Sequence, residues 1–303
     1  MAIPPVRLKP DTTYPVRLKL DTTCVVTRGA LVIAIVAVLA VHSAVAQSTP
    51  DRATVLRAAA DALGMVRWSD IGAGTTRLPA IDVVNTMEFE GSGTTESAGR
   101  AVKTQYHVAL GYNPPAMRVE MTRAGPDGGA PQRTIHTVRD TNAWDESEIG
   151  AGLAPGKGTA TPAAAALRER LLQLWTLPYG VVKAALAAGE KTAVSTEGGA
   201  TVITFPLSGP LAGITVKAML DSNNLVTRVE TRPDNPALAT LATQTEFANY
   251  ADRAEVLTDI KSPGRMIRKQ GGRTLLDIDV KTWETNNPYL VFPVPPNVKT
   301  AAN

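Results

Sequence analysis

The residue types that could do chemistry are few in this sequence, and their spacing rarely suits a reaction. His107 and His136 lie in separate strand-like segments and show neither His-x-His nor His-x-x-x-His spacing. Zinc sites in proteins normally need three or four ligands. We therefore expect each histidine on the face of a sheet, and we expect no metal ion and no other cofactor.

Two glycine-rich segments match catalytic loops only in part. Ser92 lies in EGSG at residues 90–93, which lacks the Gly-x-Ser-x-Gly spacing of a nucleophile elbow, and we interpret it as a turn after a strand. Residues 156–159 read GKGT, where a second glycine separates the lysine from the threonine that a phosphate-binding loop requires next to it. This segment predicts a flexible loop ahead of a helix. With no supported nucleophile or acid pair, we expect a protein that is not an enzyme.

The acidic side chains follow ordinary structural patterns. Asp277 and Asp279 alternate with apolar residues, which is typical of a half-buried strand with its acids in water. Asp145, Glu146 and Glu148 form a small acidic cluster, and we interpret it as a solvated loop. Neither group predicts general acid–base chemistry.

One stretch of the chain is locally basic and contributes the surface candidates, which are Lys261, Arg265, Arg268, Lys269 and Arg273. Such a run could meet a membrane phosphate or an acidic partner. The favoured alternative is an edge hairpin kept soluble by its charges, as natural sheets commonly are. Aromatic residues are not interleaved with these charges, so we expect no nucleic-acid partner.

Apolar side chains give a second set of candidates. Flexible methionines mixed with aromatic rings can line a lipid-binding cavity, although they more often fill a core. The ligand-cavity candidates are Met87, Phe89, Met117, Met121, Trp144, Trp175, Phe205 and Met219. Sequence alone does not separate a cavity from a core, because both show the same pattern.

The elements that must position these residues are mainly strands. A helix is predicted from the capping residues at 49–51 to Gly64, and another begins at Thr161 with Pro162 in its first turn, is broken by Pro178 and resumes over Val181–Ala188. Period-two strands are predicted at Ile81–Glu90, Met117–Arg123, Arg133–Val138 and Asn142–Asp145. Hairpins are predicted for Ile214–Leu220 with Leu225–Glu230 and for Arg265–Lys269 with Thr274–Trp283. This pattern predicts one α+β domain, mainly antiparallel β, over residues 47–303.

The first 46 residues predict export. Leu31–Val41 is an uncharged apolar run that follows Arg28 and precedes Ala44-Val45-Ala46, which is the pattern of a cleaved signal peptide over residues 27–46. The run is shorter than the roughly 20 residues of a membrane-spanning helix, so we expect no transmembrane anchor after cleavage. Residues 1–26 contain a duplicated decapeptide, and we interpret them as spurious or disordered sequence ahead of the true start.

Charge and composition then describe a neutral exported protein. The whole chain has 303 residues, 44% of them hydrophobic, with 31 basic and 28 acidic side chains. Removing residues 1–46 takes away five basic and two acidic residues, which leaves the rest of the chain neutral. The predicted location is the periplasm or the extracellular space. The only cysteine, Cys24, precedes the apolar run, so disulfides and thiolate sites are excluded beyond residue 46.

Three stretches resemble a known family. They are Leu174–Leu186, Asn224–Thr231 with Asn235-Pro236, and Arg265–Asn286. Together they resemble a secreted bacterial segment that often precedes a metallo-β-lactamase-fold hydrolase domain, and that segment is similar to the periplasmic lipoprotein carriers. The resemblance covers roughly residues 52–298. It implies a curved, half-open β-barrel with a few helices packed on or in it.

The resemblance also implies a function. It implies a non-enzymatic carrier that binds a lipid, a lipoprotein acyl chain or another apolar ligand in the half-barrel. The alternative is an interaction module for a protein partner, associated with such a hydrolase and without a ligand of its own. The hydrolase motif His-x-His-x-Asp-His is absent from the sequence, and residues 237–240 replace a Gly-Asp turn that relatives tend to show.

Overall fold

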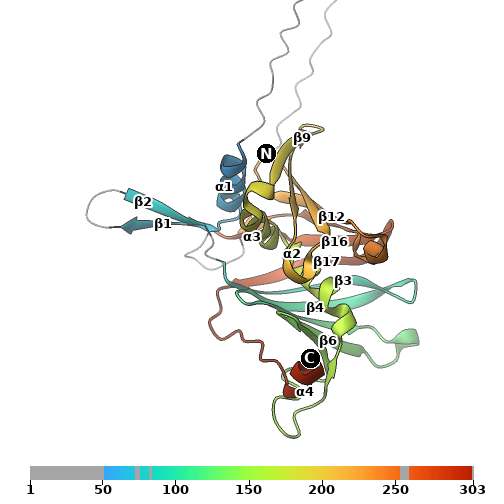
Figure 1. Ribbon diagram of the computed structural model, residues 1–303. Helices are drawn as coiled ribbons and strands as arrows, with labels where there is room; N and C mark the ends of the chain where they lie inside the picture. Colours follow the sequence, from blue (N-terminus) through green and yellow to red (C-terminus); the bar gives the residue numbers. More distant parts are fainter. Residues whose placement is uncertain (1–50, 72–75, 82–83, 253–258, 302–303) are drawn as a thin grey trace, which may run out of the picture. The chain divides into compact units, whose positions relative to one another are not determined.

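The computed structural model describes residues 51–71, 76–81, 84–252 and 259–301 (Figure 1). The chain divides into two units, Met1–Ala46 and Gln47–Asn303, and only the second is described below. The duplicated segment at 1–26 and the signal peptide at 27–46 lie outside the described residues, so both stay predictions.

Helices are few and short compared with the strands. The α-helices are α1 (Arg52–Ala62), α2 (Leu167–Trp175), α3 (Pro178–Ala188) and α4 (Pro296–Ala301). The strands of the first half are β1 (Val66–Ile71), β2 (Thr76–Ile81), β3 (Thr86–Ser97), β4 (Arg100–Tyr112), β5 (Pro115–Arg123), β6 (Gln132–Arg139), β7 (Asn142–Glu146) and β8 (Ala160–Pro162). Those of the second half are β9 (Ala193–Glu197), β10 (Ala200–Pro206), β11 (Ile214–Leu220), β12 (Val226–Pro233), β13 (Thr243–Ala248), β14 (Ala251–Asp252), β15 (Lys261–Ser262), β16 (Arg265–Gln270) and β17 (Arg273–Thr285).

One curved antiparallel sheet of 13 strands organises the domain (Figure 1). Its order is β8-β7-β6-β5-β4-β3-β17-β16-β13-β12-β11-β10-β9, and within the described part of the chain β8 and β9 are its two edges. The sheet is therefore open and not a closed barrel. The predicted fold class, α+β with a half-open barrel of mainly antiparallel strands, is confirmed.

The first helix forms where the sequence predicts it. The Asp51 side chain caps α1 by accepting a hydrogen bond of 2.9 Å from the Thr54 backbone N–H. The helix ends before Gly64, whose φ is +72° and where an added Cβ would lie 2.4 Å from the Asp259 carbonyl oxygen. Glycine is required there by both the backbone conformation and the close approach of residue 259.

The second predicted helix begins later than expected. Thr161 and Pro162 belong to strand β8, where Thr161 pairs with Asp145 of β7, and α2 starts only at Leu167. The predicted break before a second, separate helix is confirmed: α2 ends at Trp175, and Pro178 is the first residue of α3. Proline suits that position, because the first turn of a helix has no intrahelical acceptor for its N–H groups.

Both predicted hairpins are confirmed, as β11 with β12 and β16 with β17. The interpretation of the basic run as an edge hairpin was wrong, since β16 and β17 lie in the middle of the sheet. The turn predicted at Ser92 was also wrong. This segment lies inside β3, where Cβ atoms at Gly91 and Gly93 would meet β17 backbone atoms at 2.6 and 2.0 Å. The glycines allow this close strand pairing.

The two faces of the sheet are covered by different parts of the chain. Helices α2 and α3 cover the inner face, where α2 contacts β5 and β6 and α3 contacts β10. The outer face is crossed by the C-terminal segment: Phe292 packs on Ala109 and Ala116, and α4 places Val298 against Trp144. A side chain on any strand therefore has one of two distinct environments.

Candidate functional site

A cavity of about 320 Å³ lies between α2 and the inner face of the sheet. It is lined by alternate residues of neighbouring strands, because side chains on a strand alternate between faces. Its apolar wall consists of Phe89, Val108, Met117, Val119, Met121, Phe247 and Met266. These residues come from β3, β4, β5, β13 and β16. Strand β17 lies between β3 and β16 in the sheet, and its Leu276 also lines the cavity.

The Phe89 ring is part of the sheet surface that faces α2 across this cavity. It is 2% exposed and stacks on Trp283 with ring centroids 4.4 Å apart. The Trp283 indole donates a hydrogen bond of 3.2 Å to the Pro263 carbonyl, so its orientation is fixed. An aromatic pair of this kind is worth about 0.5–1.5 kcal/mol beyond its area burial. The Phe89 ring is consequently held in place by contacts outside the cavity.

Helix α2 forms the roof of this cavity, and a polar cluster on α2, β6 and β7 holds the helix in place. Arg170 is buried and donates hydrogen bonds to the carbonyls of Thr137 at 3.0 Å and Trp144 at 2.6 Å. Its guanidinium also binds the carboxylate of Asp145 and lies 3.0 Å from Nδ1 of His136. This arrangement fixes α2 across the strands.

His136 and Asp145 form a close pair within that cluster, with Nδ1 and Oδ1 2.7 Å apart. Burial raises the pKa of Asp145, but the hydrogen bond from His136 and the charge of Arg170 outweigh it, so its pKa is below the ordinary value. His136 lines the cavity. The described lining holds no serine or cysteine for it to activate.

Three further polar residues, Arg268, Tyr106 and Arg123, line the cavity. The buried Nε of Arg268 has no hydrogen-bond partner in the described part of the chain, and burial lowers the pKa of this guanidinium. Burial raises the pKa of Tyr106 to about 12. Arg123 donates through Nε to the Thr95 hydroxyl at 3.0 Å.

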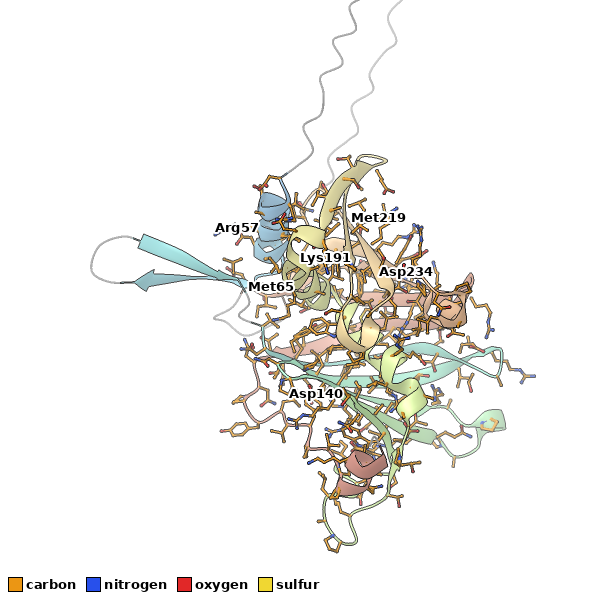
Figure 2. All side chains as sticks on the ribbon, in the orientation of Figure 1. Arg57, Met65, Asp140, Lys191, Met219 and Asp234 are labelled. Atoms are coloured by element: carbon orange, nitrogen blue, oxygen red, sulfur yellow. The ribbon has the colours of Figure 1, made fainter. Side chains whose placement is uncertain are left out.

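The apolar candidates from the sequence separate into four environments. Phe89, Met117 and Met121 line the cavity. Met87 and Phe205 are buried in the main core, and Trp175 lines a second cavity. Met219, labelled in Figure 2, alternates with the buried residues of β11 and lies on the outer face. Trp144 is also on the outer face, against α4.

The basic candidates do not form a free patch. Arg265 binds Asp277 through Nε and Nη2 at 3.0 and 2.9 Å. Lys269 pairs with Glu246 and Arg273 with Glu96, each at 2.8 Å. The acids come from neighbouring strands, which local sequence does not reveal. Lys261 is exposed in β15, and Arg268 alone of the five enters the cavity.

The acidic cluster after Trp144 is partly buried, which corrects the predicted solvated loop. Glu146 is 6% exposed and accepts hydrogen bonds from the Thr137 hydroxyl, the Trp144 indole and the Gly150 N–H at 2.8–2.9 Å. These three donors compensate the desolvation of its carboxylate. Its role is structural, beneath α4.

A second cavity of about 620 Å³ lies beside α3. Its lining includes Trp175, Leu207 and Leu211, and its polar residues include Asp140 and Lys191, both labelled in Figure 2. Within the described ranges, no group of three or more His, Cys, Asp or Glu residues could hold a metal ion.

No single helix among the described residues is long and apolar enough to cross a membrane. The bent pair Ala164–Trp175 with Pro178–Lys191 has the necessary length and composition only when its two helices are taken together.

No family model matches the chain, and no curated protein matches it. Among solved structures, it is similar to a chain described as an outer membrane lipoprotein-sorting protein domain from Vibrio parahaemolyticus, with 10% identity, a TM-score of 0.44, and coverage of 83% of this chain and 99% of that one. It is also similar to a DUF1329 family protein from Desulfovibrio piger, with 8% identity, a TM-score of 0.44, and coverage of 78% and 93%. The function proposed below rests on the cavity and on neither similarity.

Proposed function

We propose that this protein binds a lipid or another apolar small molecule in the cavity under α2, as an exported, non-enzymatic carrier. The observation that supports the proposal is the cavity itself. Its volume of about 320 Å³ is at the lower end of the roughly 300–1,000 Å³ usual for small-molecule sites, which are mostly apolar with a few polar groups. Export rests on the predicted signal peptide at 27–46.

The lining combines fixed and adaptable surfaces. Phe89 is held by Trp283, whereas Met117, Met121 and Met266 come from strands on both sides of it. Methionine side chains are unbranched and polarisable, so they can adjust to chains of different shape. This combination suits an apolar ligand recognised by contact area.

The polar lining favours binding over catalysis. His136 is engaged by Asp145 and Arg170, and these contacts fix the helix that covers the cavity. A nucleophile would need to lie within about 3 Å of such a base. The hydroxyls of the described lining belong to threonines and Tyr106, and no hydrogen bond joins any of them to His136; Thr95 and Thr176 have hydrogen-bond partners elsewhere.

The test uses the full chain, expressed with its own leader. Organic extraction of the purified protein followed by mass spectrometry identifies any lipid that co-purifies, and titration with the uncharged dye N-phenyl-1-naphthylamine measures binding in the delipidated protein. We expect saturable dye fluorescence that a co-purified lipid displaces.

Two matched variants locate the binding site. Met121→Trp adds an indole to a partly buried residue of the cavity, and Met219→Trp makes the same change at a partly buried residue of the outer face. We expect the first to weaken dye binding about 10-fold or more and the second to leave it unchanged. Absence of saturable binding in the unaltered protein would contradict the proposal and favour an interaction module.

A further inference from the structure

Arg268 lies where two cavities meet. A smaller cavity of about 280 Å³ adjoins the first, and Arg268, Glu169 and Leu275 line both. The first cavity carries the apolar wall, whereas the smaller one also has Arg168, Thr240 and Gln270 in its lining. The Arg268 side chain therefore lies at the junction of the two cavities.

The Arg268 guanidinium has no carboxylate in direct contact among the described residues. Among the described residues no hydrogen bond or ion pair reaches its guanidinium, and its Nε is fully buried. The other cations of its own segment differ in this respect, since Arg265, Lys269 and Arg273 each bind a carboxylate. Several kcal/mol is the usual cost of leaving a buried charge uncompensated. A site that keeps such a cation is suited to an anionic ligand.

Neighbouring strands bring further donors to the same place. Arg268 pairs with Leu276 of β17, and Leu276 pairs with Thr95 of β3, so the three lie in one row across the sheet. The Arg123 guanidinium reaches that row through its bond to the Thr95 hydroxyl. The Tyr106 ring also lines the cavity. Two arginines therefore lie at one end of the apolar wall.

Two acids lie at this end of the cavity, and neither forms an ion pair with Arg268 in the described structure. Glu96 binds Arg273 at 2.8 Å. Glu169 lines the cavity from α2 and its charge acts on Arg268, but in the described structure these two side chains form no ion pair. The site consequently keeps an excess of positive charge next to an apolar wall.

We propose that the ligand is a single-chain amphiphile with a carboxylate headgroup, of the fatty-acid class, and that Arg268 binds the carboxylate. This inference rests on the proposed function and specifies its ligand. The chain would lie along Phe89, Met117 and Met266, with the headgroup at the junction of the two cavities. A volume of about 320 Å³ suits one short chain better than the several chains of a phospholipid or lipoprotein. A bond between two charged groups is also stronger than a neutral one.

The experiment compares dodecanoate with dodecanol, which have the same chain length and differ in headgroup charge. Isothermal titration of the delipidated full chain gives both dissociation constants. We expect dodecanoate to bind about 10- to 100-fold more tightly, as a charge-assisted hydrogen bond of roughly 1.5–3 kcal/mol implies. In Arg268→Gln that difference in affinity should fall to about 3-fold or less. The control is Arg265→Gln, which removes another charge of β16, one that is paired with Asp277, and it should keep the difference.

The outcomes separate this inference from the function on which it rests. Equal binding of the two ligands by the unaltered protein would overturn the carboxylate site and leave apolar binding intact. Binding of neither, together with no dye binding, would overturn the function itself. If Arg268→Gln does not fold, Arg268→Lys replaces it in the test. Because lysine keeps the charge, this variant should still bind dodecanoate more tightly than dodecanol, and equal binding of the two would overturn the carboxylate site. Tighter binding of a two-chain phospholipid than of dodecanoate would also refute the proposal.

Discussion

Replacing Arg170 with methionine tests how the roof of the cavity is held. The Arg170 side chain is 10% exposed and connects α2 to β6 and β7 through the carbonyls of Thr137 and Trp144. Methionine keeps most of the aliphatic contacts and removes only the guanidinium. The variant therefore isolates the polar contribution to the attachment of the helix.

The magnitude follows from the groups left without partners. Each hydrogen bond from a charged donor contributes roughly 1.5–3 kcal/mol, and a buried carbonyl left unpaired costs about 1–3 kcal/mol. The ion pair with Asp145 adds little, because that carboxylate is 46% exposed and solvent screens it. We expect Arg170→Met to lower the free energy of unfolding by about 3 kcal/mol, or the melting temperature by about 6–12 °C.

Urea unfolding followed by circular dichroism and tryptophan fluorescence measures this loss, with Asp145→Asn as the comparison. If the carbonyl contacts dominate, Arg170→Met loses nearly the same stability in the presence and absence of the Asp145 carboxylate. A loss below about 1 kcal/mol, or a loss that disappears in the Asp145→Asn background, would refute the reasoning.

Three further predictions concern charge and burial. Arg268→Met removes a half-buried cation whose Nε is buried without a hydrogen-bond partner in the described structure. The melting temperature should therefore rise, by about 2–4 °C for each 1 kcal/mol gained, and a fall would show that the charge is compensated. Burial lowers the pKa of Lys183 from 10.5 to about 8, so between these pH values the unfolded chain binds more protons than the folded one. The unaltered protein should therefore gain stability relative to Lys183→Met as the pH rises from 8 to 10. Urea midpoints with no such trend would contradict this. Glu146→Gln replaces one oxygen of a buried acceptor by an amide donor, so unfolding should become easier by about 1–3 kcal/mol, and a calorimetric melt identical to that of the unaltered protein would refute the role given to its three hydrogen bonds.

Local pattern predicted the strands whose two faces differ. In β11, Ile214, Val216, Ala218 and Leu220 are buried and alternate with more exposed residues, so both the strand and its hairpin could be found. No range was predicted for β4, because its last five residues are buried on both faces. Ala109 there is covered by Phe292, which lies far away in the sequence. Alternation disappears where a distant segment covers the outer face.

The candidate site was only partly predictable for the same reason. Met121 and Met219 occupy similar alternating strands, yet one faces the cavity and the other the outer face, and only the helices that cover the sheet distinguish them. Arg268 resembled its basic neighbours in sequence. Its difference comes from the carboxylates of Glu96, Glu246 and Asp277, which β3, β13 and β17 bring to the other cations but not to it.

The pairing of β17 with β3 has a consequence for how the chain folds. Strands β3–β8 pair with their neighbours in sequence, and β9–β13 do the same, whereas the two groups join in one sheet through residues as distant as Leu276 and Thr95. Contacts between distant residues form slowly, because a long loop must close first. This seam is therefore expected to form late.

The cavity spans that seam, since Thr95 and Leu276 both line it. A bound ligand would contact both halves of the sheet at once and would bind only after they have joined. If a ligand binds there as proposed, it would slow the separation of the halves as well as stabilise the folded state. The residues that bind the ligand would then also set the rate of unfolding.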